Sequence, residues 1–322
     1  MSLLYPFKFH PIIKEKIWGG QKLQQLLHKP TTSIEAGESW EISDVEGDTS
    51  VVSNGPLKGT SLKTLMDTYT SDLMGAKNFR QFETKFPLLI KFIDAKQDLS
   101  VQLHPNDQLA KERHNSFGKT EMWYVVQADP ESNLIVGFNQ EMTQELYLKH
   151  LEDKTLQNIL NFDAVQAGDT YFIEVGRIHA IGAGVLLAEI QQTSDITYRV
   201  YDWDRVDSDG NERELHNDIA LEAFDFDMPD NFRVDYTKGS NTPTELVSCP
   251  YFTTNVMDVN ERILKVNTHD SFMIYMCVDG NARIEVDGNQ TEISMGETVL
   301  IPACIKQFSI SANHAKLLEV YV

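Results

Sequence analysis

Short apolar runs, separated by Gly, Asn, Asp and Pro, make up most of the chain. Runs rich in β-branched and aromatic residues are typical of strands, and they occur at 86–95, 121–128, 132–138 and 169–175. Apolar residues at three- and four-residue spacing predict helices at 61–69, 144–160 and 214–224. Short strands at this density predict a mainly β fold, a sandwich or barrel with helical decoration.

The stretch VQLHPND, residues 101–107, has the alternation of a strand. Side chains two apart in a strand share a face, so Gln102 and His104 are expected to point the same way. If that face is buried, both polar groups need hydrogen-bond partners or a ligand. For this stretch alone, a hydrogen-bonded structural histidine is the commoner explanation. Pro105-Asn106-Asp107 is predicted to be the turn that ends the strand.

The C-terminal part of the chain is predicted to be a separate β domain. Residues 235–250 are rich in Gly, Ser, Thr and Pro, which is typical of a linker. Beyond them, strands alternate with turns, and Asp279-Gly280 and Asp287-Gly288 are hairpin-turn signals. We therefore predict two domains, residues 1–235 and 236–322.

Two windows of the chain resemble each other, which predicts an internal repeat of one β module. Residues 168–181 (GDTYFIEVGRIHAI) and 296–309 (GETVLIPACIKQFS) both begin with Gly-acid-Thr and continue through an apolar strand. A second similarity lies upstream, between EMWYVVQAD and FMIYMCVDG. The resulting alignment pairs Glu174 with Pro302, Gly176 with Cys304, His179 with Gln307, and Glu121 with Phe272.

The first copy of the repeat carries polar residues that the second lacks. One carboxylate, two imidazoles and an amide oxygen are a suitable ligand set for Zn²⁺ or a neighbouring first-row metal. A Zn²⁺ ion with these ligands keeps a net positive charge and can act as a Lewis acid. The alternative is that all four residues are structural. The predicted ligands are Gln102, His104, Glu121 and His179.

These residues resemble the signature motifs of the cupins. Gly168, Gly176 and His179 are similar to the second cupin motif, although Glu174 replaces its Pro and Ala183 its terminal Asn. The first motif, H-x-H followed by Glu, here has Gln in place of the first His. That replacement resembles one cupin family, the type I mannose-6-phosphate isomerases, in a compact bacterial form.

Further stretches between residues 17 and 216 resemble the same family. They are IWGG (17–20), GESWEIS (37–43), FPLLIKFIDAKQDLSVQLHPND (86–107), GKTEMWYV (118–125), LLAEIQQTSDITYRVYDWDR (186–205) and RELH (213–216). The resemblance implies two cupin-type β-barrel or jelly-roll modules, of which only the first binds metal. Trp18 and Trp40 lie in these stretches, and each is expected to be a core residue more readily than a sugar platform.

The resemblance implies interconversion of mannose 6-phosphate and fructose 6-phosphate through a cis-enediol, with one Zn²⁺ per chain. It places Arg199 in the active site, where its guanidinium suits an oxyanion or a phosphate. Glu189 is the preferred base, and a metal-bound water is the alternative. Glu189 could instead be the partner of Arg199 or Lys91. Lys91 and Lys119 are predicted to be either substrate-binding cations or structural counter-ions.

Composition limits the partners of the protein. A formal net charge of −20 argues against nucleic acid and anionic membranes, and a phosphate substrate would need a local group of cations. No segment approaches the ~18 apolar residues of a membrane span. The first twenty residues do not resemble a signal peptide, and the three Cys residues form no C-x-x-C pair. We therefore expect a cytoplasmic protein, as a monomer or a weak homo-oligomer.

Two other functions fit a cupin fold. A cupin oxygenase would need Fe and open coordination positions for O₂, and Gln102 in place of the usual His argues against it. A sugar-binding or regulatory cupin would bind the phosphorylated sugar without converting it. Turnover of mannose 6-phosphate without O₂ separates the isomerase from both.

Overall fold

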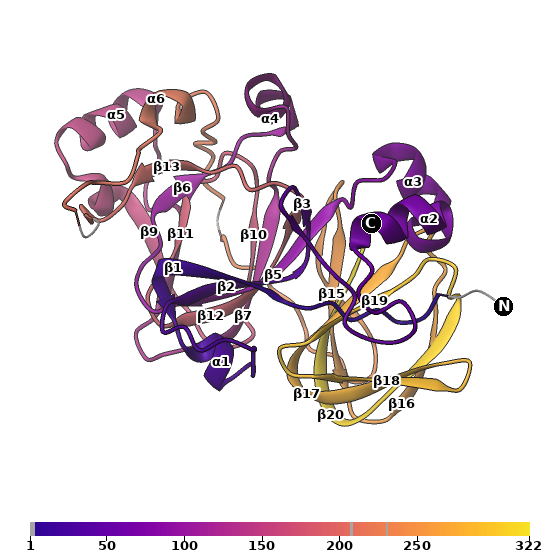
Figure 1. The fold of residues 1–322 in the computed structure, drawn as a ribbon. Helices are drawn as coiled ribbons and strands as arrows, with labels where there is room; N and C mark the ends of the chain where they lie inside the picture. Colours follow the sequence, from indigo (N-terminus) through magenta and orange to yellow (C-terminus); the bar gives the residue numbers. More distant parts are fainter. Residues whose placement is uncertain (1–3, 207–208, 230) are drawn as a thin grey trace.

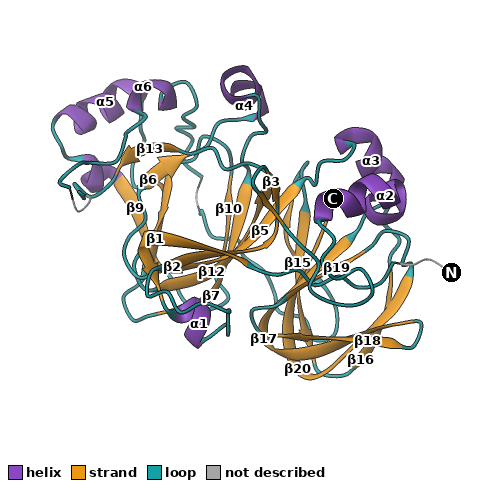
Figure 2. Cartoon of the chain, viewed as in Figure 1, coloured by secondary structure: helices purple, strands orange, loops and turns teal. Residues whose placement is uncertain are grey.

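A computed structural model describes residues 4–206, 209–229 and 231–322 (Figure 1). Strands predominate over helices in this part of the chain (Figure 2), which confirms the predicted mainly β fold. The strands form large open antiparallel sheets and a small two-stranded ribbon, β3(Asp44–Val45) with β4(Asp48–Thr49). Among the described residues the sheets do not close into barrels.

A six-stranded sheet forms the centre of the molecule, in the order β1-β2-β5-β12-β7-β10. Every residue of β5 and β12 is buried, because other parts of the protein cover both faces of the sheet. The strands are β1(Ile12–Gly20), β2(Ala36–Ile42), β5(Leu88–Ala95), β7(Glu121–Ala128), β10(Thr170–Ile173) and β12(Val185–Gln192).

A five-stranded sheet packs on one face of this central sheet, in the order β13-β6-β11-β8-β9. Buried side chains from both sheets, including Trp123, Val136 and Leu187, form the core between them. The strands are β6(Val101–Leu103), β8(Asn133–Phe138), β9(Leu160–Ala164), β11(His179–Ile181) and β13(Tyr198–Tyr201).

A third sheet is built from residues 244–321, with β14, β15, β20, β17 and β18 in order and with β16 and β19 paired to β20 and β17. Its inner face has a core of its own, which includes Tyr275 and Leu317. The strands are β14(Thr244–Ser248), β15(Thr253–Val259), β16(Arg262–Val266), β17(Met273–Val286), β18(Asn289–Ser294), β19(Thr298–Ile301) and β20(Gln307–Tyr321).

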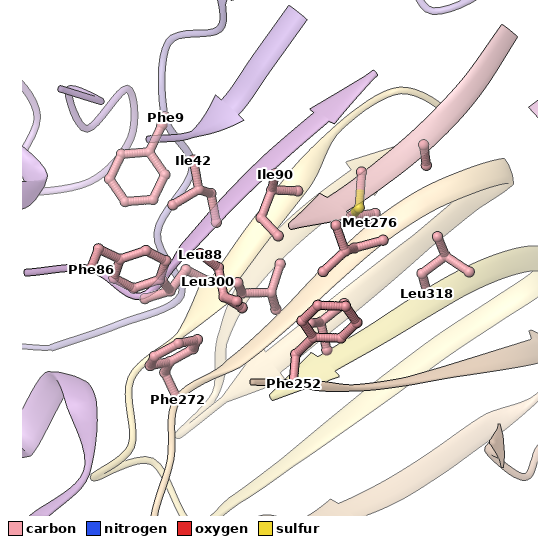
Figure 3. Close-up of a cluster of buried hydrophobic side chains, with 14 of the residues drawn as sticks. Phe9, Ile42, Phe86, Leu88, Ile90, Phe252, Phe272, Met276, Leu300 and Leu318 are labelled. Carbon is pink, nitrogen blue, oxygen red and sulfur yellow. The ribbon is translucent and has the colours of Figure 1, made fainter. Parts of the chain in front are cut away.

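The outer face of the third sheet packs on the central sheet. Ile42, Leu88 and Ile90 of the central sheet meet Met276 and Leu318 of the third sheet in one continuous apolar cluster (Figure 3). Burial of apolar surface stabilises the contact by roughly 25 cal/mol per Å². The two β regions are therefore held together by a core rather than by a flexible linker.

Helices cover the ends of the sheets. They are α1(Lys22–Gln25), α2(Leu62–Met74), α3(Ala76–Phe82), α4(Asp107–His114), α5(Gln144–Glu152), the 3-10 helix η1(Leu156–Ile159) and α6(Asn217–Ala220). Helices therefore occur within each of the three predicted helical stretches, whereas α1, α3 and α4 were not predicted. No helix of the described residues is long and apolar enough to cross a membrane.

Helices α2 and α3 lie against the third sheet although in the chain they come between β2 and β5, two strands of the central sheet (Figure 1). Backbone amides of Ala303 and Cys304 donate to the carbonyls of Leu73 and Asp72 at the end of α2. The carboxylate of Asp270 accepts from the first amides of α3. The division at residue 235 stays a prediction, and this N-terminal helical pair contacts the region beyond it.

Two local expectations differ from the structure. Pro105-Asn106-Asp107 is more than a turn, because the Asn106 side chain accepts from the Leu109 amide and caps helix α4. Asp279-Gly280 does not end a strand. Strand β17 runs through it with a register shift at Cys277 and Asp279, so the positive φ of Gly280 serves a bulge. Asp287-Gly288 is the predicted hairpin turn between β17 and β18.

Candidate functional site

The predicted ligand-bearing stretch lies on β6 and just after it. Gln102 pairs with His179 of β11 across the five-stranded sheet, and His104 follows the end of β6. Glu121 is the first residue of β7 in the central sheet. Pairing within the five-stranded sheet joins Gln102 to His179, 77 positions apart in the chain, and the packing of the two sheets adds Glu121.

His104, Glu121 and His179 form one buried group, and each offers a ligand atom within 4.8 Å of the others. Nε2 of His104 lies 3.5 Å from Oε2 of Glu121, and Nε2 of His179 lies 3.6 Å from Oε1. Each side chain is about 1% exposed. These separations are longer than hydrogen bonds but short enough for one ion to contact all three atoms.

The remaining contacts fix which imidazole nitrogens face the carboxylate. Nδ1 of His104 hydrogen-bonds the Ile196 carbonyl at 2.9 Å, and Nδ1 of His179 hydrogen-bonds the Arg177 carbonyl at 2.8 Å. A carbonyl only accepts, so both Nδ1 atoms carry the proton and both Nε2 lone pairs point inward. Nε2 of His104 and both Glu121 oxygens are buried without a hydrogen-bond partner. Lone pairs converging in this way fit a divalent cation.

Burial determines the protonation of the three groups. It lowers the pKa of His179 to about 4 and that of His104 well below its usual value. Burial, reinforced by the nearby Glu189 charge, raises the pKa of Glu121 to about 7. Neutral imidazoles are what a metal requires, and a bound cation would favour the ionised form of the carboxylate.

Gln102 completes the group of four predicted residues. Its Nε2 lies 3.3 Å from Nε2 of His179, so the amide can donate to the imidazole lone pair. The opposite orientation of the same amide would present Oε1, the atom that a metal binds. The structure thus brings all four predicted residues together, and Gln102 and His179 also line a cavity.

A cavity of about 240 Å³ opens beside this group. Gln102, His179, Lys91, Lys119, Glu189 and Arg199, all predicted as site residues, line it. His104 and Glu121 are not among the lining residues, but Glu121 contacts both His104 and His179, and His179 reaches the cavity. Further residues of its wall include Trp18, Trp40, Lys16, Glu38, Asp195 and Arg213.

Glu189 is firmly held. Its Oε1 accepts from Lys91 Nζ at 3.0 Å, and its Oε2 accepts from Trp123 Nε1 at 2.9 Å. Burial alone would raise the pKa of Glu189, but Lys91 and Lys119 outweigh it and hold the pKa below its usual value. The charge of Lys91 is supported in turn, because Glu189 and Glu38 overcome burial and raise its pKa.

The other two cations differ in their surroundings. Lys119 is buried, with Nζ 3.4 Å from Oε2 of Glu121. Arg199 is half-buried and forms no ion pair among the described residues, although it donates to the Ser100 hydroxyl and the Glu214 carbonyl. Burial and the nearby Arg213 lower the pKa of Arg199. Its charge is therefore the one most available to an anionic ligand in the cavity.

Sequence reasoning did not assign a role to Lys16, Asp195 or Arg213, although all three line the cavity. Arg213 opens the RELH stretch, whose resemblance to the family was the available signal. Its guanidinium is bound to the buried Asp202, which also binds Arg205. Trp18 and Trp40 are buried, as expected of core residues, and each also lines the cavity.

The third sheet contains a second copy of the site without its ligands. Tyr275 donates to Glu319 at 2.6 Å where Trp123 donates to Glu189, and the two pairs occupy matching register positions. The ring of Tyr275 meets Phe308 edge-on, as Trp123 meets His179.

This correspondence corrects the sequence alignment by one residue at two positions. Met273, not Phe272, takes the place of Glu121. Met273 pairs with Ile301, the last residue of β19, as Glu121 pairs with Ile173, the last residue of β10. Phe308, not Gln307, takes the place of His179. Lys265 pairs with Phe308 as Gln102 pairs with His179, so a lysine stands where the first copy has its amide.

Comparison with known proteins agrees with this architecture. The catalytic-domain model of type I phosphomannose isomerase matches residues 6–141, and the cupin-domain model of mannose-6-phosphate isomerase matches residues 242–322. The chain is 33% identical over 309 residues to mannose-6-phosphate isomerase ManA of Bacillus subtilis, covering 95% of each chain. It is also 33% identical over 301 residues to mannose-6-phosphate isomerase of Streptococcus mutans, covering 93% of each.

A solved structure shows the same fold. The mannose 6-phosphate isomerase of Bacillus subtilis superposes with a TM-score of 0.89 at 30% identity, over 99% of this chain and 100% of that one. The fold and the matching cupin-domain model define a cupin, and its buried His-Glu-His group could hold a metal ion. The chain belongs to the type I mannose-6-phosphate isomerases, a family of aldose–ketose isomerases.

Proposed function

We propose that this protein is a metal-dependent isomerase that interconverts mannose 6-phosphate and fructose 6-phosphate. The observation that carries the proposal is the inward-facing set of lone pairs on His104, Glu121 and His179, at the wall of a cavity lined by cations. The family and the relatives' names supply the substrate.

Gln102, His104, Glu121 and His179 would hold the ion, which we propose to be one Zn²⁺ per chain because mixed imidazole and carboxylate ligands suit it. When bound, it would act as a Lewis acid toward the substrate oxygens on C1 and C2. The cis-enediol route then requires a proton to leave one of these carbons and return to the other.

Arg199 is proposed to stabilise negative charge on the substrate. It lines the cavity without a carboxylate partner among the described residues, so its donors do not have to be released from an ion pair. Its planar guanidinium can bind a developing oxyanion or a phosphate with two parallel hydrogen bonds. Lys119 and Lys91 add positive charge deeper in the cavity, which favours an anionic substrate.

Two roles are open for Glu189. It lines the cavity and is ionised at neutral pH, so it can accept a proton as the predicted base. Its two hydrogen bonds and low pKa favour the alternative, in which it is the counter-ion of Lys91. In that case a metal-bound water would transfer the proton between the two carbons.

Turnover in ²H₂O tests the proposed reaction. The metal-loaded protein is incubated with mannose 6-phosphate, and the sugar phosphates are analysed by NMR and mass spectrometry. We expect fructose 6-phosphate to form anaerobically, with solvent deuterium at C1 when the abstracted proton exchanges. Binding of the substrate without any fructose 6-phosphate would contradict an isomerase and favour a binding cupin.

A further inference from the structure

Asp107 connects three distant parts of the chain. It lies at the start of α4, three residues after His104. Its Oδ1 accepts from the Gly118 amide at 2.8 Å and from Nε2 of Gln192 at 3.0 Å. Its Oδ2 accepts from the Tyr251 hydroxyl at 2.8 Å. Both oxygens of this carboxylate are therefore engaged.

The segment fastened by Asp107 leads directly to Glu121. The Lys119 amide donates to the Pro105 carbonyl at 3.3 Å, and the Thr120 amide donates to Oε1 of Gln192 at 2.9 Å. Three successive amides, at positions 118, 119 and 120, are thus held immediately before the carboxylate ligand. The spacing between the segments carrying His104 and Glu121 depends on these bonds.

Gly118 allows the close approach that this arrangement needs. A Cβ at this position would lie 2.7 Å from the Asp107 amide nitrogen and 2.9 Å from the Asn106 carbonyl carbon. Backbone atoms cannot yield to such a contact without moving one segment away from the other. The two ligand-bearing segments therefore meet at van der Waals distance.

Tyr251 reaches Asp107 from the third sheet. It is anchored by its neighbour Phe252, which is 1% exposed, and by the turn in which the Cys249 amide donates to the Phe252 carbonyl. Burial and the Asp107 carboxylate raise the pKa of Tyr251 to about 12, so its hydroxyl remains a donor across the ordinary pH range. A rigid, protonated phenol can orient a carboxylate.

We propose that Tyr251 is a positioning residue through which the C-terminal sheet sets the distance between the ligands His104 and Glu121. The inference rests on the proposed function in one respect, that these residues hold a metal. The C-terminal module, which has other residues at the positions of the candidate ligands, would then help to position the site of the first module. Tyr251 itself does not line the cavity.

The test compares Tyr251→Phe with Tyr236→Phe in the full-length protein. Tyr236 is a matched control because its hydroxyl donates to the Gly168 carbonyl at 2.7 Å, in a connection that does not involve Asp107. Both variants and the wild type are loaded with Zn²⁺, and its release to a coloured chelator is followed. We expect release from Tyr251→Phe to be about three- to tenfold faster, and from Tyr236→Phe to be unchanged within about twofold.

Hydrogen exchange gives a second measurement that does not depend on activity. Amides 118–120 should exchange faster in Tyr251→Phe than in Tyr236→Phe, because the orientation of Asp107 is no longer fixed. In an Asp107→Ala background, Tyr251→Phe should have no further effect on metal release. Additive effects in the double variant would overturn the proposed connection.

The outcomes separate this inference from the proposed function. A wild type that takes up no Zn²⁺ overturns both. A wild type that holds Zn²⁺, with Tyr251→Phe releasing it at the rate of Tyr236→Phe, overturns the inference alone. Faster release confined to Tyr251→Phe supports it.

Discussion

At the scale of single residues, the site is marked by buried polar atoms of His104 and Glu121 that have no hydrogen-bond partner. His104 and His179 each use Nδ1 for a backbone carbonyl and direct Nε2 toward Glu121. A buried lone pair facing a carboxylate is unfavourable unless a cation lies between them. A positive charge would therefore stabilise the cluster. The ammonium group of Lys119 supplies one near Oε2 of Glu121, at 3.4 Å.

Glu189→Gln distinguishes the two roles proposed for this residue. If it is the counter-ion of Lys91, its loss lets burial lower the Lys91 pKa, so Lys91 loses its proton at a lower pH. The alkaline limb of the kcat profile should then move to lower pH, with turnover kept below that limb. If Glu189 is the base, kcat should fall about 10²- to 10⁴-fold at every pH. A profile and rate equal to the wild type would exclude both roles.

Individual site residues were predictable where the signal was local. The alternation around Gln102 and His104 gave their shared face, because strand geometry has a period of two. The bond between Lys91 and Glu189 spans 98 residues and forms only when β5 and β12 pair. Glu189 was therefore given two alternative partners, Arg199 and Lys91, and sequence reasoning alone could not choose between them.

At the scale of elements, the two copies of the repeat treat the same buried carboxylate differently. Glu319 of the second copy takes the place of Glu189, and it pairs with Lys265, the residue at the position of Gln102, whereas Glu189 pairs with Lys91. Asn255 adds a donor to the same carboxylate at 3.1 Å. Glu319 is buried, and its contacts with Asn255, Lys265 and Tyr275 connect β20 to β15, β16 and β17.

Lys265→Met should destabilise the protein without removing activity. The substitution leaves the Glu319 carboxylate buried without its ammonium partner, so we expect the free energy of unfolding in urea to fall by about 3 kcal/mol. Lys316→Met is the control, because its pair with Asp258 is 3.5 Å long and partly exposed and is worth about 1 kcal/mol or less. Equal losses in the two variants would contradict the role of Lys265.

Element types were predicted better than element boundaries. The strands at 86–95 and 121–128 follow from their composition, because strand-forming side chains dominate both. Asp279-Gly280 was misassigned because a bulge and a hairpin turn use the same φ > 0 residues. The sequence alignment of the repeat was also one residue off at Met273 and Phe308. Similarity of residue types does not show which face of a strand a side chain is on.

At the scale of the whole molecule, the cavity reconciles an acidic protein with an anionic substrate. The formal net charge is −20, yet the cations of the cavity wall, Lys16, Lys91, Lys119, Arg199 and Arg213, outnumber its acids Glu38, Glu189 and Asp195. Charges within the cavity act over a few ångströms in a poorly screened space, whereas surface charges are screened beyond about 10 Å. The net charge can be counted from the composition, but the fold determines which charged residues line the cavity.

The C-terminal sheet completes the molecule in two ways. Its outer face buries one side of the central sheet through residues such as Ile90 and Met276 (Figure 3). Tyr251 then reaches Asp107, three residues after His104. Neither contact was predictable from the linker-like composition of residues 235–250, because composition does not show which surfaces pack together.

The most direct test of the account is the metal dependence of turnover. Conversion of mannose 6-phosphate is measured for the purified protein as isolated, after chelator treatment, and after Zn²⁺ is restored. His104→Ala is measured beside it, with His150→Ala, a histidine of α5 outside the cavity, as the control. We predict that chelation and His104→Ala each abolish turnover, that Zn²⁺ restores only the chelated wild type, and that His150→Ala behaves as wild type. Full turnover by the metal-free protein, or stoichiometric Zn²⁺ retained by His104→Ala, would contradict the account.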